Sequence, residues 1–127
     1  MKYMTMDTPI NLFHQSSYTR MFDAGEVILK EGERDSVMYV IQSGEVDIVR
    51  DGVTITTLRE GHLLGELSAI TLRPHVTSAI ARTDGVLAAI DKDTFNYLVD
   101  HSPRFVHKLL HVISERLQNT WQIVELH

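Results

Sequence analysis

The sequence of 127 residues contains no cysteine, which excludes disulfide bonds, thiolate catalysis and cysteine-ligated zinc. This absence fits a protein of the reducing cytoplasm. Long apolar runs are missing too, because the longest, such as residues 37–41 and 86–90, span five residues, far fewer than a membrane-spanning helix needs. The first residues include no apolar segment of the kind found in secretory signal peptides. We therefore expect a soluble, cytoplasmic protein.

Basic residues are also scarce, with 12 Lys and Arg against 17 Asp and Glu and a formal net charge of -5. Sequence-independent binding to nucleic acid relies on basic side chains that neutralise phosphates, so a direct nucleic-acid partner is not expected. The hydrophobic share of 43% is ordinary for one globular domain of this length. We expect a single domain over residues 1–127.

Between Phe22 and Ile90 the chain alternates short β-prone runs with turns that contain glycine and aspartate. This pattern is typical of an all-β sandwich or barrel. Asp51-Gly52 is the strongest hairpin signal, because a type I′ turn needs positive φ angles that aspartate tolerates and glycine favours. The expected strands are residues 26–30, 37–42, 45–50, 53–58, 76–82 and 86–90.

After residue 91 the pattern predicts two helices. Asp93 or Thr94 can cap a short helix at about 93–99, and Ser102-Pro103 opens a long one at about 103–124. Apolar residues on the long helix recur in alternating steps of four and three, the spacing of a coiled-coil seam. The members of this seam are Val106, Leu110, Ile113, Leu117, Thr120 and Val124.

A second apolar stripe, Phe105, Leu109 and Val112, covers a neighbouring face in the first half of the long helix. We expect this stripe to pack on the β body while the seam meets a second copy to form a homodimer. The alternative is that both stripes pack within one chain, as amphipathic helices commonly do.

The segment most informative about function is residues 64–79, with the sequence LGELSAITLRPHVTSA. A short helix that begins near Gly65 would point free backbone N–H groups outward and form a small anion-binding nest. The alternatives are structural, since Gly65 can serve a tight turn and Glu66 can cap the helix or pair with Arg73.

This segment resembles the phosphate-binding cassette of cyclic-nucleotide-binding domains, found in catabolite-activator-type regulators, protein kinase A regulatory subunits and nucleotide-gated channels. The family pattern is Gly-Glu-Leu-Ala, a helical turn, then Pro-Arg-Ala-Ala-Thr entering a strand, and the resemblance extends over about residues 22–117. It implies a mainly β fold, a double-stranded β-helix (jelly-roll) barrel followed by a short and a long helix. It also implies cAMP or cGMP as a possible ligand.

The resemblance assigns roles to individual positions. It implies that Glu66 accepts a hydrogen bond from the ribose 2′-hydroxyl, and that backbone N–H groups of Leu67 and Ser68 help to hold the phosphate. Ser68 stands where the family has alanine, and Val76 and Thr77 match positions that contact ligand. The candidate ligand-binding residues are Gly65, Glu66, Leu67, Ser68, Arg73, His75, Val76 and Thr77.

The main departure is His75, which stands where the family has the arginine that forks onto the phosphate. Loss of a charge-assisted hydrogen bond costs about 1.5–3 kcal/mol. Two substitutes are open: a protonated His75 that binds in a pH-dependent way, or Arg73, which an extended chain before Pro74 places on the same side. The plainer alternative is that His75 is a solvated surface histidine.

Other chemistry finds little support in the sequence. His107 and His111 lie four residues apart, but the glutamate that zincins require after the first histidine is missing. The sequence also contains no His-x-His pair, which a cupin metal site would need. We expect no metal, no resident cofactor and no enzymatic activity. The predicted function is a regulatory module that binds a small anionic ligand and signals through its C-terminal helix to a protein partner. The alternative is a degenerate domain that binds no nucleotide and serves dimerisation or protein docking.

Overall fold

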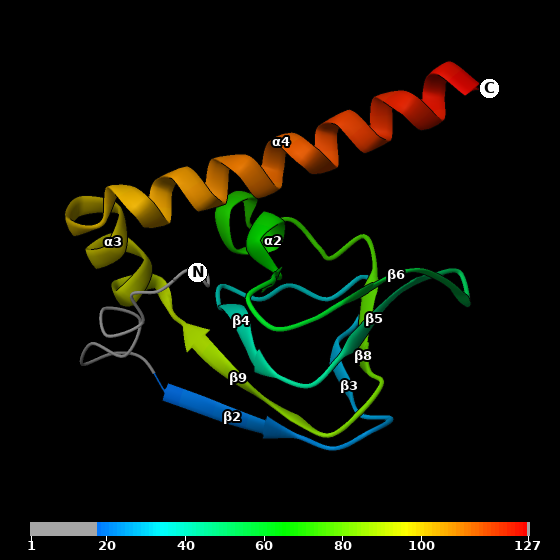
Figure 1. Ribbon diagram of the computed structural model, residues 1–127, viewed down its shortest axis with the longest axis horizontal. Coiled ribbons are helices and arrows are strands. Elements are labelled where there is room, and N and C mark those ends of the chain that lie inside the picture. Colours follow the sequence, from blue (N-terminus) through cyan, green and yellow to red (C-terminus); the bar gives the residue numbers. More distant parts are fainter. Residues whose placement is uncertain (1–17, 127) are drawn as a thin grey trace.

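The computed structural model describes residues 18–126, with the surroundings of side chains defined as far as Gln118. Two sheets form a β body, and the long helix α4 runs across one end of it with α2 beneath and α3 at its start (Figure 1). The elements are β2 (Tyr18–Phe22), β3 (Val27–Leu29), β4 (Met38–Ser43), β5 (Val46–Arg50), β6 (Val53–Leu58), β7 (Leu63–Leu64), α2 (Glu66–Thr71), β8 (Ser78–Ala81), β9 (Gly85–Ile90), α3 (Lys92–His101) and α4 (Pro103–Leu126).

The strands pair in the orders β2-β9-β4-β7 and β3-β8-β5-β6, and every pairing is antiparallel. Side chains from both sheets meet in one apolar cluster between them, which includes Ile41, Val46 and Leu87. Only glycine fits at position 85, where β2 meets β9, because a Cβ there would overlap the Phe22 ring and the carbonyl oxygen of Ser43. The predicted jelly-roll body followed by two helices is confirmed.

The β5–β6 hairpin forms as predicted. Asp51 and Gly52 have φ angles of 53° and 79°, the positive values that a type I′ turn requires. Strands β2 and β7 were not predicted, so the β body begins at Tyr18 rather than Phe22. β2 lacks a regular apolar alternation because it contains Thr19 and Arg20, and β7 spans two residues.

Both predicted helices are present with shifted boundaries. α3 covers Lys92–His101 rather than 93–99, and its cap is Asp91, neither Asp93 nor Thr94. The Asp91 carboxylate accepts a hydrogen bond from the N–H of Thr94 at 2.9 Å. At the start of α4, Ser102 Oγ accepts from the N–H of Phe105 at 3.2 Å, as the Ser-Pro opening predicts. No helix in residues 18–126 is long and apolar enough to cross a membrane.

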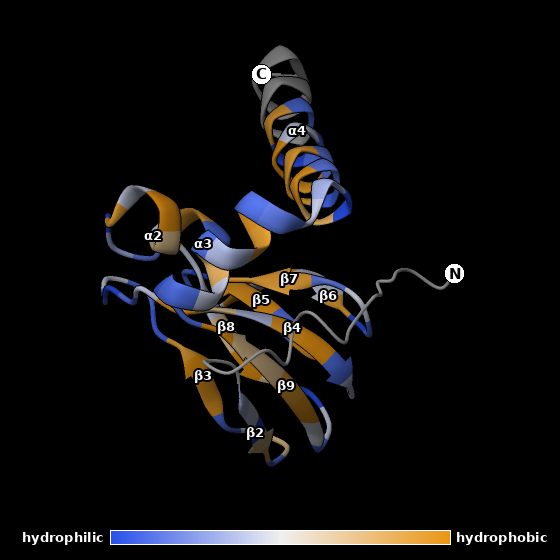
Figure 2. Ribbon diagram, turned by 90° about the vertical axis from the view of Figure 1, so that its left-hand side faces the viewer, coloured by the Kyte–Doolittle hydropathy of each residue, from blue (hydrophilic) through white to orange (hydrophobic). Residues whose placement is uncertain are grey.

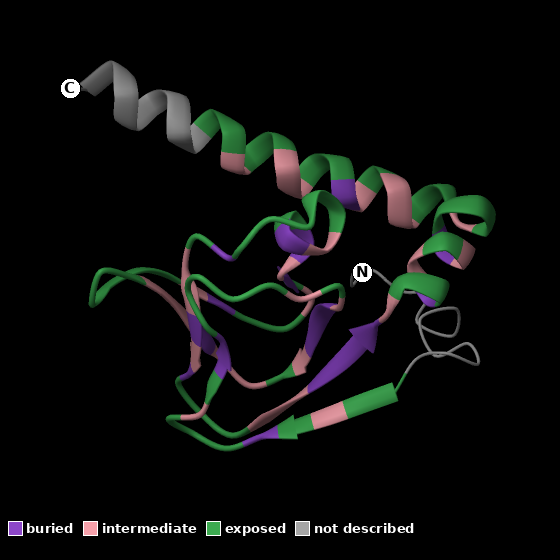
Figure 3. Ribbon diagram, turned by 180° about the vertical axis from the view of Figure 1, so that it is seen from behind, coloured by how far each residue is buried: buried purple, intermediate pink, exposed green. Residues whose placement is uncertain are grey.

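Helices α3 and α4 cover the outer face of the sheet β2-β9-β4-β7 through a second apolar cluster. Figure 2 shows hydrophobic residues on these two helices and on the strands beneath them. The predicted second stripe of α4 takes part, with Leu109 buried and Phe105 and Val112 packed beside it. Of the seam, Ile113 also packs here, whereas Leu110 and Leu117 are 58% and 56% exposed. Figure 3 shows the same division along the helix. Thr120 and Val124 lie beyond the described side chains.

Candidate functional site: a cassette beneath the long helix

The cassette, residues 65–77, leaves β7, forms α2 and returns to β8. Gly65 opens it with φ 75° in the left-handed region, which glycine adopts without steric cost. A Cβ there would lie 3.3 Å from Leu29 Cδ1 and 3.4 Å from the carbonyl oxygen of Val37. Gly65 therefore serves the tight turn that the sequence suggests and brings the start of α2 close to the end of the β body.

Glu66, the first residue of α2, is completely buried. Its carboxylate Oε2 forms an ion pair with Nη1 of Arg116 on α4. Nη2 of Arg116 also donates to the carbonyl oxygen of Leu63 at 3.3 Å. Of the two structural roles that the sequence suggested for Glu66, pairing with Arg73 is wrong, since its partner is Arg116. One side chain of the cassette is thus held directly by the long helix.

Arg116 is the functional-site residue that the sequence analysis missed. It lies 50 positions from Glu66 in the chain, so no local motif joins the two. A signal was available in the helix, because Arg116 follows Leu109, Val112 and Ile113 at steps of three and four. Such steps place residues on one helix face, which is the face that packs on the β body.

The environment of Glu66 disfavours its charge. Burial raises the pKa of the Glu66 carboxyl above its usual value, and the opposing attraction of Arg116 only partly offsets this rise. Within the described chain Oε1 has no hydrogen-bond partner. A buried acceptor without a donor lowers the stability of the fold, because it has lost its hydrogen bonds to water. The described chain therefore leaves a buried acceptor of the cassette unsatisfied.

Ser68, which replaces the alanine of the family pattern, is buried and holds the cassette together. Its hydroxyl donates to the carbonyl oxygen of Arg73 at 2.7 Å and accepts a longer bond, 3.4 Å, from the N–H of Asp35. The first contact joins α2 to the segment that follows it, and the second joins α2 to the loop before β4. The substitution thus adds cross-links within the cassette.

His75 is buried, 9% exposed, so the plainer interpretation of a solvated surface histidine is wrong. Its backbone N–H donates to the carbonyl oxygen of Glu33 at 2.8 Å, and its own carbonyl accepts from Gly32 at 2.9 Å. The imidazole points toward the start of α2, with Cε1 3.8 Å from the Cβ position at Gly65. His75, which the resemblance aligns with the family arginine, therefore turns its imidazole toward the start of α2, where the anion nest is predicted.

The remaining predicted ligand residues differ in exposure. Leu67 and Val76 are exposed, and Thr77 is half-buried where the cassette enters β8. Arg73 is also exposed, and within the described chain its guanidinium forms no ion pair. The structure places all these residues on one cassette, whereas their contacts with a ligand stay predictions.

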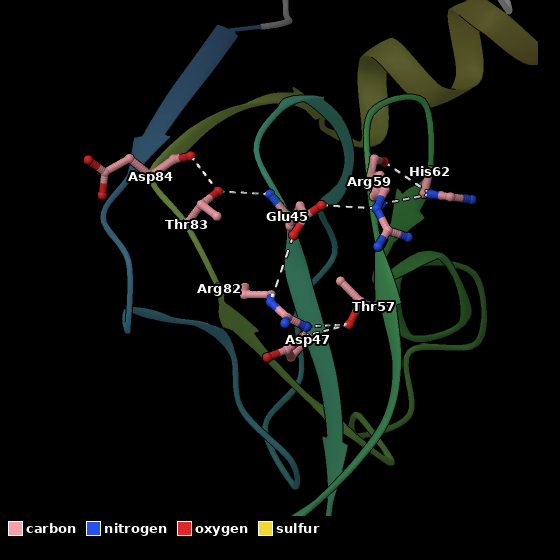
Figure 4. Close-up of polar contacts among 8 residues, drawn as sticks. All are labelled: Glu45, Asp47, Thr57, Arg59, His62, Arg82, Thr83 and Asp84. Atoms are coloured by element: carbon pink, nitrogen blue, oxygen red, sulfur yellow. Dashed lines mark hydrogen bonds and ion pairs between the residues drawn. The ribbon is translucent and has the colours of Figure 1, made fainter.

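Two other arginines near the second sheet are already neutralised. As Figure 4 shows, Glu45 accepts from Nε of Arg59 at 3.0 Å and lies 3.8 Å from Nε of Arg82. Arg82 also lies 3.7 Å from the carboxylate of Asp47, which accepts from the Thr57 hydroxyl at 2.8 Å. These balanced charges tie β5 and β6 to the end of β8 and leave no unpaired cation in this network.

The structure gives no metal centre to the described residues, because no three histidine, aspartate or glutamate side chains gather in residues 18–126 in a way that suits an ion. His111 instead lies 3.5 Å from Glu115, one turn further along the exposed face of α4.

Comparison with known proteins places this geometry in a family. The regulatory subunit of the cAMP-dependent protein kinase from Yarrowia lipolytica is 29% identical over 85 residues, 67% of this chain and 23% of the relative. A cGMP-dependent protein kinase from Plasmodium berghei is 30% identical over 107 residues, 84% of this chain and 12% of the relative. The chain therefore spans less than a quarter of the length of either relative.

Solved structures agree. The catabolite activator protein of Thermus thermophilus superposes with a TM-score of 0.80 at 25% identity, covering 91% of this chain and 62% of that protein. The sequence model of the cyclic nucleotide-binding domain matches residues 19–102, more than half of the chain. This match covers both sheets, the cassette and α3, and the chain accordingly belongs to the cyclic nucleotide-binding domain family.

Proposed function

We propose that this chain is a non-catalytic, cytoplasmic regulatory module that binds a cyclic nucleotide, or a small anion of similar shape, in the cassette and transmits binding through α4. The observation that carries this proposal is the buried Glu66 carboxylate, which belongs to the cassette and is held by Arg116 of the long helix. The names of the kinase relatives, which specify cAMP and cGMP, support the class of ligand.

The coupling follows from the two oxygens of that carboxylate. A ribose hydroxyl donates to Oε1, which lacks a partner in the described chain, and thereby reduces the negative charge that Oε2 offers to Arg116. Arg116 is 39% exposed and also contacts the backbone carbonyl of Leu63, so this link between the cassette and α4 lies partly in solvent. A ligand that changes this contact shifts α4 between two positions.

His75 sets the pH dependence of binding in this proposal. Its ring faces the start of α2, and protonation would give it the charge that the family arginine supplies. Because only a protonated ring carries this charge, binding of a phosphate should be tighter at about pH 6 than at about pH 7.5.

Calorimetric titration with cAMP and cGMP at these two pH values tests the proposal. The wild type should bind, more tightly at the lower pH, and His75→Arg should bind more tightly than the wild type at the higher one. Glu66→Gln should weaken binding, whereas Glu60→Gln, which changes an exposed carboxylate outside the cassette, should not. An absence of heat from both the wild type and His75→Arg would refute nucleotide binding.

Homodimerisation through α4 is a further part of the proposal, because Leu110 and Leu117 expose apolar surface one heptad apart. Leu110→Glu/Leu117→Glu should halve the mass measured by light scattering, and Ser114→Glu, a charge at another exposed position of α4, should leave it unchanged. An unchanged mass for the double variant would contradict dimerisation along this seam.

A second candidate function is a dimerisation or docking module that binds no nucleotide. The observation that favours it is His75 in place of the phosphate-binding arginine, together with the exposed seam of α4. Under this alternative Glu66→Gln and His75→Arg would leave the output of the protein unchanged, and the Leu110 and Leu117 substitutions would abolish it. A protein partner carries that output in either case.

A further inference from the structure

Within residues 18–126, the two sheets end in four edge strands, β2, β7, β3 and β6. β7 and β3 contain two and three residues, and β2 carries Arg20, whose side chain is held by Glu26 at 3.0 Å. Short length and charge are the usual means by which proteins prevent an edge from pairing with another strand. Three of the four edges are therefore protected.

β6 lacks this protection. Its six residues, VTITTL, include no charge, no proline and no glycine, and five of them are β-branched, the type that favours extended strands. Val53 and Ile55 are 64% and 57% exposed, on the β5–β6 hairpin that projects from the body beside the cassette (Figure 1). The register with β5 shifts at Ile55, which has no partner there, so this local bulge is the protection that the edge of β6 retains.

The charges at the two ends of β6 indicate what pairs with it. Asp51 lies in the hairpin turn just before the strand, and Arg59 follows its last residue with a 62% exposed side chain. In a symmetric antiparallel pair, the start of each strand lies beside the end of the other. Asp51 of one copy then approaches Arg59 of its partner, twice in the same dimer; Nε of Arg59 stays on Glu45 of its own chain, and its 62% exposed side chain has further N–H groups for the second carboxylate. The uncharged strand with opposite charges at its ends is self-complementary.

We propose that β6 is a self-association edge, which pairs antiparallel with β6 of a second copy to form one continuous eight-stranded sheet. The register places Ile55 opposite the same residue of the partner, with Thr54 opposite Thr56 and Val53 opposite Thr57. Cross-strand pairs of β-branched residues and of threonines stabilise antiparallel strands. The interface is separate from α4 and does not depend on nucleotide binding.

The absence of cysteine from the chain allows a sharp test of this register. Facing residues of an antiparallel pair have Cα atoms about 4.5–5.5 Å apart, within the range that a disulfide spans. Ile55→Cys should therefore form a covalent dimer in a glutathione redox buffer, as measured on non-reducing gels. Val53→Cys is the matched control, since this register places it opposite Thr57 and far from its own copy. Equal cross-linking of the two variants, or none, would overturn the proposal.

A second experiment separates this edge from the seam of α4. The Leu110→Glu/Leu117→Glu variant lacks the α4 interface and is expected to be monomeric in dilute light-scattering samples, so the weaker β6 pair is sought at higher protein concentration. Analytical ultracentrifugation of this variant at the higher concentration should detect a dimer. Adding Ile55→Lys, which sets like charges opposite each other, should raise the dissociation constant at least about tenfold. Met21→Lys, at a 79% exposed position of β2, should leave that constant unchanged. A monomeric background, or equal effects of the two lysines, would show that β6 does not self-associate, whatever the cassette binds.

Discussion

The two apolar clusters on opposite faces of the sheet β2-β9-β4-β7 differ in how completely their polar neighbours are satisfied. The cluster between the sheets consists almost entirely of aliphatic and aromatic side chains. The cluster beneath α3 and α4 is bordered by two buried oxygens without partners in the described chain, Thr94 Oγ1 and Glu66 Oε1. The first cluster fixes the shape of the β body. The second holds α3 and α4 beside polar atoms that lack partners, which suits the shift of α4 that the proposed function requires.

The largest expected effect comes from the cluster between the sheets. Leu87 is completely buried, and Leu87→Ala should lower the free energy of unfolding by about 3 kcal/mol because it leaves a cavity in a close-packed interior. Urea denaturation measures this change. Met21→Ala, at a 79% exposed position of β2, is the control and should cost less than about 0.5 kcal/mol, and equal losses would remove the distinction between a packed interior and an exposed face.

A smaller loss should follow from Arg116→Met. This variant leaves the buried Glu66 carboxylate without its cation, a change that costs about 3–5 kcal/mol when both groups are fully buried. Because Arg116 is 39% exposed and solvent screens its charge, we expect about 2 kcal/mol at neutral pH.

A double variant tests whether the unpaired charge of Glu66 causes this loss of stability. Glu66→Gln/Arg116→Met should recover most of the lost stability, since the double variant has no buried charge. A double variant as unstable as Arg116→Met alone would show that Arg116 acts through packing of its aliphatic chain.

Thr94→Val should stabilise the protein. The Thr94 hydroxyl is buried and has no partner in the described chain, and valine has nearly the same shape without the unpaired polar group. We expect a gain of about 1 kcal/mol in thermal or urea unfolding. Thr94→Ser, which keeps the hydroxyl and removes a methyl group, should be less stable than the wild type, and a loss of stability in Thr94→Val would indicate that the hydroxyl has a partner after all.

The smallest effect concerns pH. Burial raises the pKa of Glu66 in the folded state, so the folded protein binds this proton more tightly than the unfolded chain does. The stabilisation from Glu66 is then fully present below its unfolded pKa and is lost as the pH rises through the folded pKa. Glu66→Gln should therefore melt slightly above the wild type at pH 7 and at the same temperature near pH 4. A difference that grows toward acid would mean that Arg116 outweighs burial.

The sequence predicted those features that depend on neighbours in the chain. The Asp51-Gly52 hairpin needs only local φ angles, and the packing of Leu109 and Val112 follows from helical spacing. Local ambiguity explains the misplaced cap of α3, since Asp91 and Asp93 are both acids at the start of the same helix. The strands β2 and β7 were missed because one is irregular in pattern and the other is very short.

The candidate site was predicted only in part, because its chemistry depends on residues distant in sequence. The cassette itself was found from Gly65 and Glu66. The burial of His75 arises from its backbone pairing with Gly32 and Glu33, and the ion pair of Glu66 requires the path of α4 across the body. The backbone pairing of His75 has no motif signal. The helical steps that place Arg116 on the packed face of α4 do not identify Glu66 as its partner, so both contacts became visible only in three dimensions.

Under the proposed function, the contact between Arg116 and Glu66 also allows a protein bound to α4 to affect ligand binding in the cassette. Binding energies at two coupled sites are linked reciprocally. If ligand changes the affinity of α4 for a partner by some factor, that partner changes the affinity of the cassette for ligand by the same factor. Under the proposed function, a protein that draws α4 away from the cassette thereby tunes the ligand concentration at which the module responds. The same domain can then have different thresholds with different partners.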